Sequence, residues 1–400
     1  MLEVNFEEHY TSRWSRVQEY FPKEYDPWDM IKTQTRNVVK GLIEEITQTE
    51  FSQQIKADYY QESPQRFDYR NGTRTRSLKT SFGTIKGIRV PRGRKSGYRF
   101  KLFKRYQRKH EEVDTAILWA TLCGMSNTRT TEFFHGFLQT DFSSATVTNI
   151  LKKLDAQLHT FRTFPIALNY PYLLLDGLAL HILEGGILTE KVVLFAMGID
   201  QRGQADILAF RLSDNESEEQ VKTLLNDLFK RGLTDVKVIV HDGAPGIKAA
   251  ADWVYPYAQH QRCVFHKQMN LIQNIKQAKN KKPMLKESKR IFKAKTKKEA
   301  LRRARSFKAH WQRVEPKAIA CFFQDFELCL TYFNFPKAHW PWLKTNNYLE
   351  LYFKNIRRRI RNIGCFRNRF SAERYLFGLT KLIGHRLDTI TSTSYLHTFC

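Results

Sequence analysis

The sequence predicts an α/β fold in which a central group of β-strands is preceded and followed by helices. Apolar, strand-like runs cluster between residues 170 and 242, and helical periodicity returns on both sides of them. Hydrophobic residues make up 42% of the 400 residues, which at this length is enough to build buried cores. This composition excludes a disordered, low-complexity or collagen-like chain.

At roughly 150 residues per domain, we expect two to four folded units. The chain divides into six segments: an N-terminal helical arm (1–65), a basic β-hairpin region (66–110), a helix-turn-helix-like region (111–165), the first part of an α/β core (166–266), a basic helical insertion (267–340) and the C-terminal helices of the core (341–400). The sequence has no apolar window of the length that a membrane helix needs and no signal-peptide pattern, so we expect a cytoplasmic protein.

The N-terminal third contains a helix and a hairpin. Residues 33–59 have helical spacing, which predicts an ordinary packed helix, with a dimerisation or docking arm as the alternative. Residues 78–92 alternate between apolar and polar side chains, and Gly83 lies at the bend, which indicates a β-hairpin.

Helical periodicity resumes between Val113 and Leu158. Gly124 is expected to stop one helix, Ser126 to cap the next, and Ser144 to cap a third that runs through Leu154. Short helices joined by tight turns are typical of a helix-turn-helix module, although ordinary helical domains share this layout.

Four strands are predicted after Tyr170. The runs PYLLLDGLALHIL, EKVVLFAMGID and QADILAFRL form a meander, with a turn at residues 200–203 between the last two. Ser213 is expected to cap a helix that is acidic at its start and basic at its end. The run VKVIVHDG then returns as a fourth strand. A meander, a helix and a returning strand are the opening of an RNase H-like fold.

The positive charge is concentrated in three tracts. The formal net charge is +26, but residues 66–109 hold 16 Lys and Arg against one acid, residues 267–313 hold 17 against two, and residues 351–370 hold seven against none. A single tract is consistent with a solvated face, whereas three tracts indicate a surface for nucleic acid. The candidate phosphate contacts are Arg74, Arg76, Lys79, Arg89, Arg92, Arg94, Lys293, Lys295, Arg302, Arg303, Arg357, Arg358, Arg359 and Arg361.

Two aspartates directly follow apolar strand runs. Asp176 ends PYLLLD, Asp242 ends VKVIVHD, and each precedes a glycine. A lone Asp-Gly pair is common in turns. Two pairs at strand ends of one sheet instead predict carboxylates that converge on Mg²⁺, in a two-ion site that needs a third acid.

Glu350 is the candidate third acid. It lies beside the apolar stripe of a helix that Thr345 or Asn346 can cap. The alternative is that Glu350 only forms an i,i+4 ion pair with Lys354 on the helix surface. Glu373 competes for the role, but it lies beyond the break at Gly364. Cys263 and His266 have half of a zinc-ligand spacing without a second pair, so we expect them to help position the active-site strand instead.

Taken together, LLLDG, HDGAP, QRCVFHKQMN and TNNYLELYFKNIRRRIRNIGCFRNRFSAERYL resemble the Mutator-type DDE transposases of bacterial insertion sequences. The resemblance implies an RNase H-like catalytic core with a helical insertion between the second Asp and the Glu. It implies that Asp176, Asp242 and Glu350 form a metal-binding catalytic triad, and that Cys263 and His266 match the C-x-x-H signature of the family.

The implied activity is cleavage of transposon ends and joining of the 3′-hydroxyl to target DNA, with two Mg²⁺ ions for which Mn²⁺ can substitute. The implied partners are double-stranded DNA and further copies of the chain, as a dimer or a higher oligomer, at the bacterial nucleoid. Two alternatives remain open: an RNase H-like nuclease or resolvase without strand transfer, and a non-catalytic DNA-binding regulator.

Overall fold

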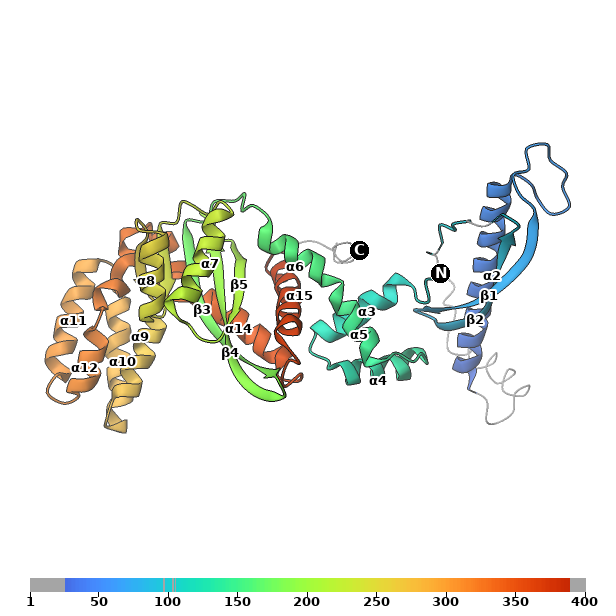
Figure 1. Cartoon of the computed structure of the whole chain (residues 1–400). Helices are drawn as coiled ribbons and strands as arrows, with labels where there is room; N and C mark the ends of the chain where they lie inside the picture. Colours follow the sequence, from blue (N-terminus) through green and yellow to red (C-terminus); the bar gives the residue numbers. More distant parts are fainter. Residues whose placement is uncertain (1–25, 96–97, 103, 105, 389–400) are drawn as a thin grey trace, which may run out of the picture. The chain divides into compact units, whose positions relative to one another are not determined.

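The computed structural model of the protein describes residues 26–95, 98–102, 104 and 106–388, with the side chains of 384–388 left out (Figure 1). The chain forms two compact units. Among the described residues, one unit contains those up to Trp119 together with Thr128–Val147, and the other contains Ala120–Asn127 together with those from Thr148 to residue 388. The six-segment division is finer than these two units and stays a prediction.

In the first unit, a long helix packs on a two-stranded sheet. The elements are α2 (Pro27–Ile55), β1 (Arg70–Thr80) and β2 (Gly83–Gly93). Asp26 caps α2 by accepting a hydrogen bond from the backbone N–H of Trp28 at 2.9 Å. The buried side chains of Phe51 and Ile55 share one core with Ile88 of the hairpin. The predicted helix and the predicted hairpin are both present.

Four short helices follow: α3 (Glu111–Leu122), α4 (Asn127–Leu138), α5 (Ser144–Lys152) and α6 (Leu154–Thr163). Gly124, with φ +106°, lies just after α3 as predicted. The cap of α5 is corrected from Ser144 to Ser143, because the Ser143 hydroxyl accepts a hydrogen bond from the backbone N–H of Thr146 at 3.2 Å. The expected continuous helix through Leu154 is also corrected, since α5 ends at Lys152 and α6 begins at Leu154.

The second unit is built on a five-stranded mixed sheet in the order β5-β4-β3-β6-β7. Strands β3, β4 and β5 form an antiparallel meander, while β6 and β7 continue the sheet in parallel with β3. Their bounds are β3 (Tyr172–Glu184), β4 (Ile187–Ile199), β5 (Ala205–Ser213), β6 (Val238–His241) and β7 (Gln259–Arg262). The four predicted strands are present, and the chain is a mixed α/β protein.

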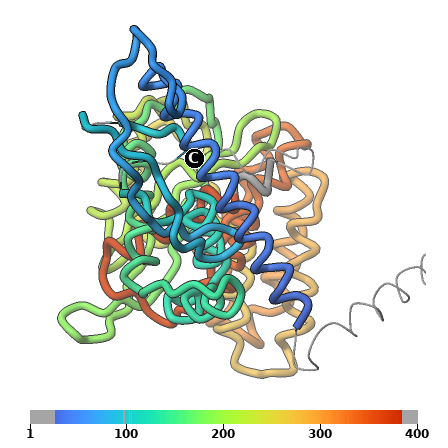
Figure 2. The backbone as a smooth tube through the Cα atoms, turned by 90° about the vertical axis from the view of Figure 1, so that its right-hand side faces the viewer, coloured from blue at the N-terminus to red at the C-terminus, as the bar shows by residue number. Residues whose placement is uncertain are grey.

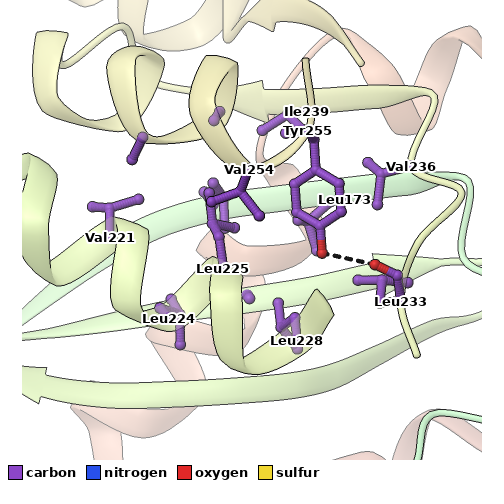
Figure 3. Close-up of a cluster of buried hydrophobic side chains, with 14 of the residues drawn as sticks. Leu173, Val221, Leu224, Leu225, Leu228, Leu233, Val236, Ile239, Val254 and Tyr255 are labelled. Carbon is purple, nitrogen blue, oxygen red and sulfur yellow. Dashed lines mark hydrogen bonds between the residues drawn. The ribbon is translucent and has the colours of Figure 1, made fainter. Parts of the chain in front are cut away.

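Helices α7 (Glu218–Lys230) and α8 (Pro245–Val254) pack on one face of this sheet. Figure 3 shows the apolar side chains of α7 and α8 facing those of β3 and β6, with the Tyr255 hydroxyl donating a hydrogen bond to the carbonyl oxygen of Leu233 at 2.9 Å. The predicted cap of α7 is corrected, because Ser213 ends β5 and donates its hydroxyl to the Asn215 carbonyl at 2.7 Å.

The other face is covered by α14 (Asn347–Ile360) and α15 (Arg369–Asp388). Phe195 of β4 contacts the rings of Tyr352 and Phe353 of α14, with centroid distances of 5.6 and 5.3 Å. The sheet therefore lies between two helical layers, and α14 is fixed against the strands that carry the candidate acids.

Between β7 and α14 the chain forms a separate helical layer with its own core, which confirms that the basic segment after residue 266 is helical. Its α-helices lie alongside one another in the backbone trace (Figure 2). Buried Phe292, Phe307 and Phe322 lie in the core of this layer. The elements are α9 (Val264–Asn274), α10 (Ala278–Phe292), α11 (Lys297–Trp311), α12 (Pro316–Phe323), the 3₁₀ helices η1 (Phe326–Asn334) and η2 (Lys337–His339), and α13 (Trp340–Leu343). No helix in the described part of the chain is long and apolar enough to span a bilayer.

Candidate active site

The two predicted aspartates lie side by side because their strands are adjacent and parallel. Leu174 of β3 pairs with Val240 of β6, and continuing this register by two residues aligns Asp176 with Asp242. The expectation that Asp176 ends its strand is corrected: β3 continues to Glu184, paired with β4 along its whole length. Asp176 lies instead where β6 stops accompanying β3, which opens the edge of the sheet beside its carboxylate.

Asp242 starts the turn that leads from β6 to α8. Its carboxylate accepts a hydrogen bond from the backbone N–H of Ala244 at 2.8 Å. Gly243 has a φ of +100°, and a Cβ at this position would lie 2.2 Å from Nε of Arg262. Arg262 in turn donates from Nε to the carbonyl oxygen of Asp242 at 3.2 Å. Glycine is therefore required here both by the backbone conformation and by the closeness of Arg262.

Glu350 reaches the site from the first turn of α14. Ligand atoms of Asp176, Glu350 and His266 lie within 4.8 Å of one another, and His266 Nε2 is 3.7 Å from a Glu350 oxygen. Asp242 does not belong to this tight group, but its negative charge raises the pKa of Asp176. The competing acid Glu373 forms an ion pair with Arg162 at 2.9 Å and is not part of the group.

Asn346, which precedes α14, joins the three segments that carry the site. Its side-chain amide donates to Asp176 Oδ2 at 3.3 Å and to the Leu175 carbonyl at 3.1 Å. Its backbone N–H donates to the sulfur of Cys263 at 3.3 Å, and its carbonyl accepts from the backbone N–H of Glu350 at 2.8 Å. Asn346 is fully buried, and its Oδ1 has no hydrogen-bond partner among the described residues. The Cys263 side chain thereby fixes the start of α14.

Opposing charges are concentrated here. Burial, followed by the charge of Asp242, raises the pKa of Asp176 to about 6, while His266 and two hydrogen bonds oppose this rise. The pKa of His266 is raised to about 9, first by its interaction with the Cys263 side chain and then by the charges of Asp176 and Asp242. A protonated His266 between Asp176 and Glu350 therefore offsets part of their negative charge, as does Arg357 at 3.8 Å from Glu350.

The donor set fits a divalent cation. Asp176, Asp242 and Glu350 offer carboxylate oxygens, the hard ligands that Mg²⁺ and Mn²⁺ take. Burial and, to a smaller extent, the charge of Asp242 raise the pKa of Asp176, and a bound cation would offset both effects. His266 could bind a metal only after losing its proton, and its nitrogen would then suit Mn²⁺ better than Mg²⁺.

Sequence reasoning missed two residues of this neighbourhood. The sequence indicates Asn346 only as a helix cap, whereas its side chain binds Asp176. Glu216, between β5 and α7, lies close enough to Asp242 and Asp176 for their charges to raise its pKa, after the larger effect of burial. Neither role follows from a local sequence pattern, so only the tertiary fold reveals it.

The candidate phosphate contacts differ in how available they are. Most are exposed: Arg74, Arg92, Arg94, Lys293, Lys295, Arg302, Arg357, Arg358 and Arg361. Arg89 is also exposed but is paired with Glu44 at 3.1 Å. The partly buried cations donate to backbone carbonyls: Arg76 to Gln107, Lys79 to Asp141 and Arg303 to Arg290.

Arg359 requires a correction. Its side chain is 5% exposed and donates to the Asn355 carbonyl at 2.9 Å. It faces the protein interior because it lies one turn beyond buried Ile356 on the packed face of α14. Arg359 is therefore removed from the expected DNA surface.

Comparison with known proteins shows which family this chain is similar to. Residues 20–384 match the family model described as "Transposase, Mutator family". A transposase for insertion sequence element IS406 from Burkholderia multivorans is 30% identical over 340 residues, covering 84% of this chain and 87% of that protein. A transposase for IS905 from Lactococcus lactis is 27% identical, covering 78% of each chain. The transposase for IS256 in transposon Tn4001 from Staphylococcus aureus is 27% identical over 393 residues, covering 97% of this chain and 98% of that protein.

Among solved structures, a chain of the simian T-cell lymphotropic virus intasome in complex with PP2A regulatory subunit B56 gamma aligns with 52% of this chain and 66% of its own length, at 10% identity. Its TM-score of 0.18 is too low to support any conclusion about fold or function.

Proposed function

Because the chain belongs to the Mutator family of transposases, we propose that it binds the terminal inverted repeats of its insertion sequence, cleaves the ends by hydrolysis and joins the freed 3′-hydroxyl to target DNA. The observation that carries this proposal is the alignment of Asp176 with Asp242 on adjacent parallel strands, with Glu350 brought to Asp176 by α14. The order of strands in the sheet supports an RNase H-like core.

In this proposal Asp176, Asp242 and Glu350 hold two Mg²⁺ ions, or Mn²⁺ in their place. When bound, such ions activate the attacking oxygen and neutralise charge at the scissile phosphate. Asn346 orients Asp176 through its amide hydrogen bond and fixes the start of the helix that carries Glu350. His266 and Arg357 balance the charge of Glu350.

DNA binding is assigned to two kinds of surface. Exposed cations of the hairpin, of the helical layer and of α14 would contact phosphates, which gives affinity without sequence choice. Helices α4 and α5 would recognise the ends through base edges, as a helix-turn-helix module does. We propose that the protein works on bacterial nucleoid DNA as a dimer or higher oligomer, since two ends must be paired.

A labelled duplex that carries the element's terminal repeat separates this function from its alternatives. With purified protein, Mg²⁺ and target DNA, we expect specific cleavage and joined products in the same reaction. Cleavage without joining would favour an RNase H-like nuclease or resolvase. Binding without cleavage in either Mg²⁺ or Mn²⁺ would favour a DNA-binding regulator and contradict the proposal.

Replacing Asn346 by alanine tests the positioning of Asp176. We expect cleavage to slow by about 10- to 100-fold, the usual effect of removing an outer partner of a metal ligand. End binding should be retained because Asn346 is fully buried. The matched control is Asn347→Ala, since Asn347 is the exposed neighbour. Thermal unfolding curves verify that both variants fold. Equal cleavage rates for the two folded variants would contradict the role given to Asn346.

A further inference from the structure

Glu216 places a fourth carboxylate beside the candidate site. It lies in the short segment between β5 and α7, whose course is fixed by local hydrogen bonds. The Ser213 hydroxyl donates to the Asn215 carbonyl at 2.7 Å, and the Asn215 side chain accepts from the backbone N–H of Ser217 at 3.2 Å. Glu216 follows β5, but this segment directs its side chain toward β3, which lies two strands away from β5 in the sheet.

Two glycines make room for Glu216. A Cβ on Gly177, the residue after Asp176, would lie 1.8 Å from Oε1 of Glu216, so the carboxylate occupies the space that any other side chain would fill. A Cβ on Gly246, in the first turn of α8, would lie 3.1 Å from the Glu216 carbonyl and 2.9 Å from the backbone nitrogen of Glu218. Glu216 is therefore held between the strand of Asp176 and the helix that follows Asp242.

The carboxylate of Glu216 has no hydrogen-bond or ion-pair partner among the described residues. Its pKa is raised by burial and then by the charges of Asp242 and Asp176, and it is lowered only by His266. Three cations lie beside the four carboxylates: His266 and Arg357 contact Glu350, and Arg262 contacts the Asp242 backbone, but none of them pairs with Glu216. A half-buried carboxylate that its neighbours repel would be stabilised by a further cation.

We propose that Glu216 is a fourth carboxylate ligand, directly or through a water molecule, of the divalent cations held by Asp176 and Asp242. This inference rests on the proposed function, because it assumes that those aspartates bind metal. By alternation Gly177 shares the α7 side of β3 with Leu173 and Leu175, so Glu216 approaches from that side, whereas Asp176 projects toward α14. The charges of Asp242 and Asp176 nevertheless reach Glu216 and raise its pKa.

The test measures the affinity of the full-length protein for Mn²⁺ by electron paramagnetic resonance or calorimetry. We expect Glu216→Gln to weaken Mn²⁺ binding by about tenfold or more and to slow cleavage at low Mn²⁺, with recovery at high Mn²⁺. Glu219→Gln, on the exposed side of α7, is the matched control and should bind as the wild type does. Gly177→Ala should reproduce the Glu216→Gln result, because its methyl group displaces the flexible end of Glu216.

Thermal unfolding separates metal binding from a purely structural role. Without metal, Glu216→Gln should unfold at the wild-type temperature or above it, since one repelled charge is removed, and added Mn²⁺ should stabilise it less than the wild type. If Glu216→Gln and Glu219→Gln bind Mn²⁺ equally while Asp176→Asn does not bind it, the Glu216 inference is overturned and the proposed function stands. If Asp176→Asn retains both Mn²⁺ binding and cleavage, the proposed function itself fails.

Discussion

Asp176→Asn is expected to reduce cleavage of the transposon end on the order of 10³-fold or more, as losses of single central catalytic groups do. Asn keeps the shape of the side chain and a hydrogen-bond acceptor, but it removes the negative charge and one of the two oxygens that hold metal. Binding of the end duplex should change little because Asp176 contributes no positive charge to the DNA surface. A gel-based cleavage assay and a binding titration on the same duplex measure both quantities.

Asp200→Asn is the matched control for this variant. Asp200 also follows a strand of the sheet, but its carboxylate accepts hydrogen bonds from the backbone N–H groups of Arg202 and Gln204, both at 2.8 Å, in the turn between β4 and β5. We expect near wild-type cleavage from this control. Wild-type cleavage by Asp176→Asn as well would show that Asp176 is not a catalytic ligand.

Neutralising exposed cations of the helical layer is expected to have the second largest effect. The triple variant Lys293→Gln, Lys295→Gln, Arg302→Gln removes three exposed charges. If each cation neutralises a phosphate, the slope of log K against log salt becomes shallower by about 0.9 for each cation removed. Affinity for end DNA should fall on the order of tenfold or more at low salt, and affinity for unrelated DNA should fall similarly because phosphates carry no sequence information.

The charge-matched control is Arg202→Gln, Lys230→Gln, Lys237→Gln, which removes three exposed cations outside the basic tracts. Fluorescence anisotropy at several salt concentrations gives both slopes. An unchanged slope in the first triple variant, or an equal change in both, would remove the helical layer from the DNA surface and leave only a general charge effect.

Much of the fold is determined by local sequence. Strands β3 to β6 each contain an apolar run, and the hairpin alternates around Gly83, so the period of the apolar residues and the turn residues between them are sufficient to predict these strands. The predictions are wrong at element ends, where Ser213 and Ser144 resemble caps. The Ser213 hydroxyl instead donates to the Asn215 carbonyl, and Ser143 rather than its neighbour Ser144 accepts the capping hydrogen bond. Both hydrogen bonds depend on the exact course of the chain.

The candidate site is only partly predictable from the sequence. Asp176 and Asp242 can be paired because parallel neighbouring strands bring equivalent positions to the same edge of the sheet, and Glu350 can be preferred to Glu373 from its helix. Glu216 and Asn346 cannot be found in this way, because their roles depend on the space above Gly177 and on the meeting of α14 with β3. Burial of Arg359 likewise depends on how α14 packs, which its run of arginines does not reveal.

The most direct measurement is an anomalous difference map from crystals of the protein grown or soaked with Mn²⁺. The prediction is density for Mn²⁺ within coordination distance of the carboxylates of Asp176, Asp242 and Glu350, and loss of that density in Asp176→Asn crystals. Mn²⁺ peaks that lie elsewhere, with these three carboxylates contacting only protein atoms and water, would contradict the assignment of this edge of the sheet as the catalytic centre.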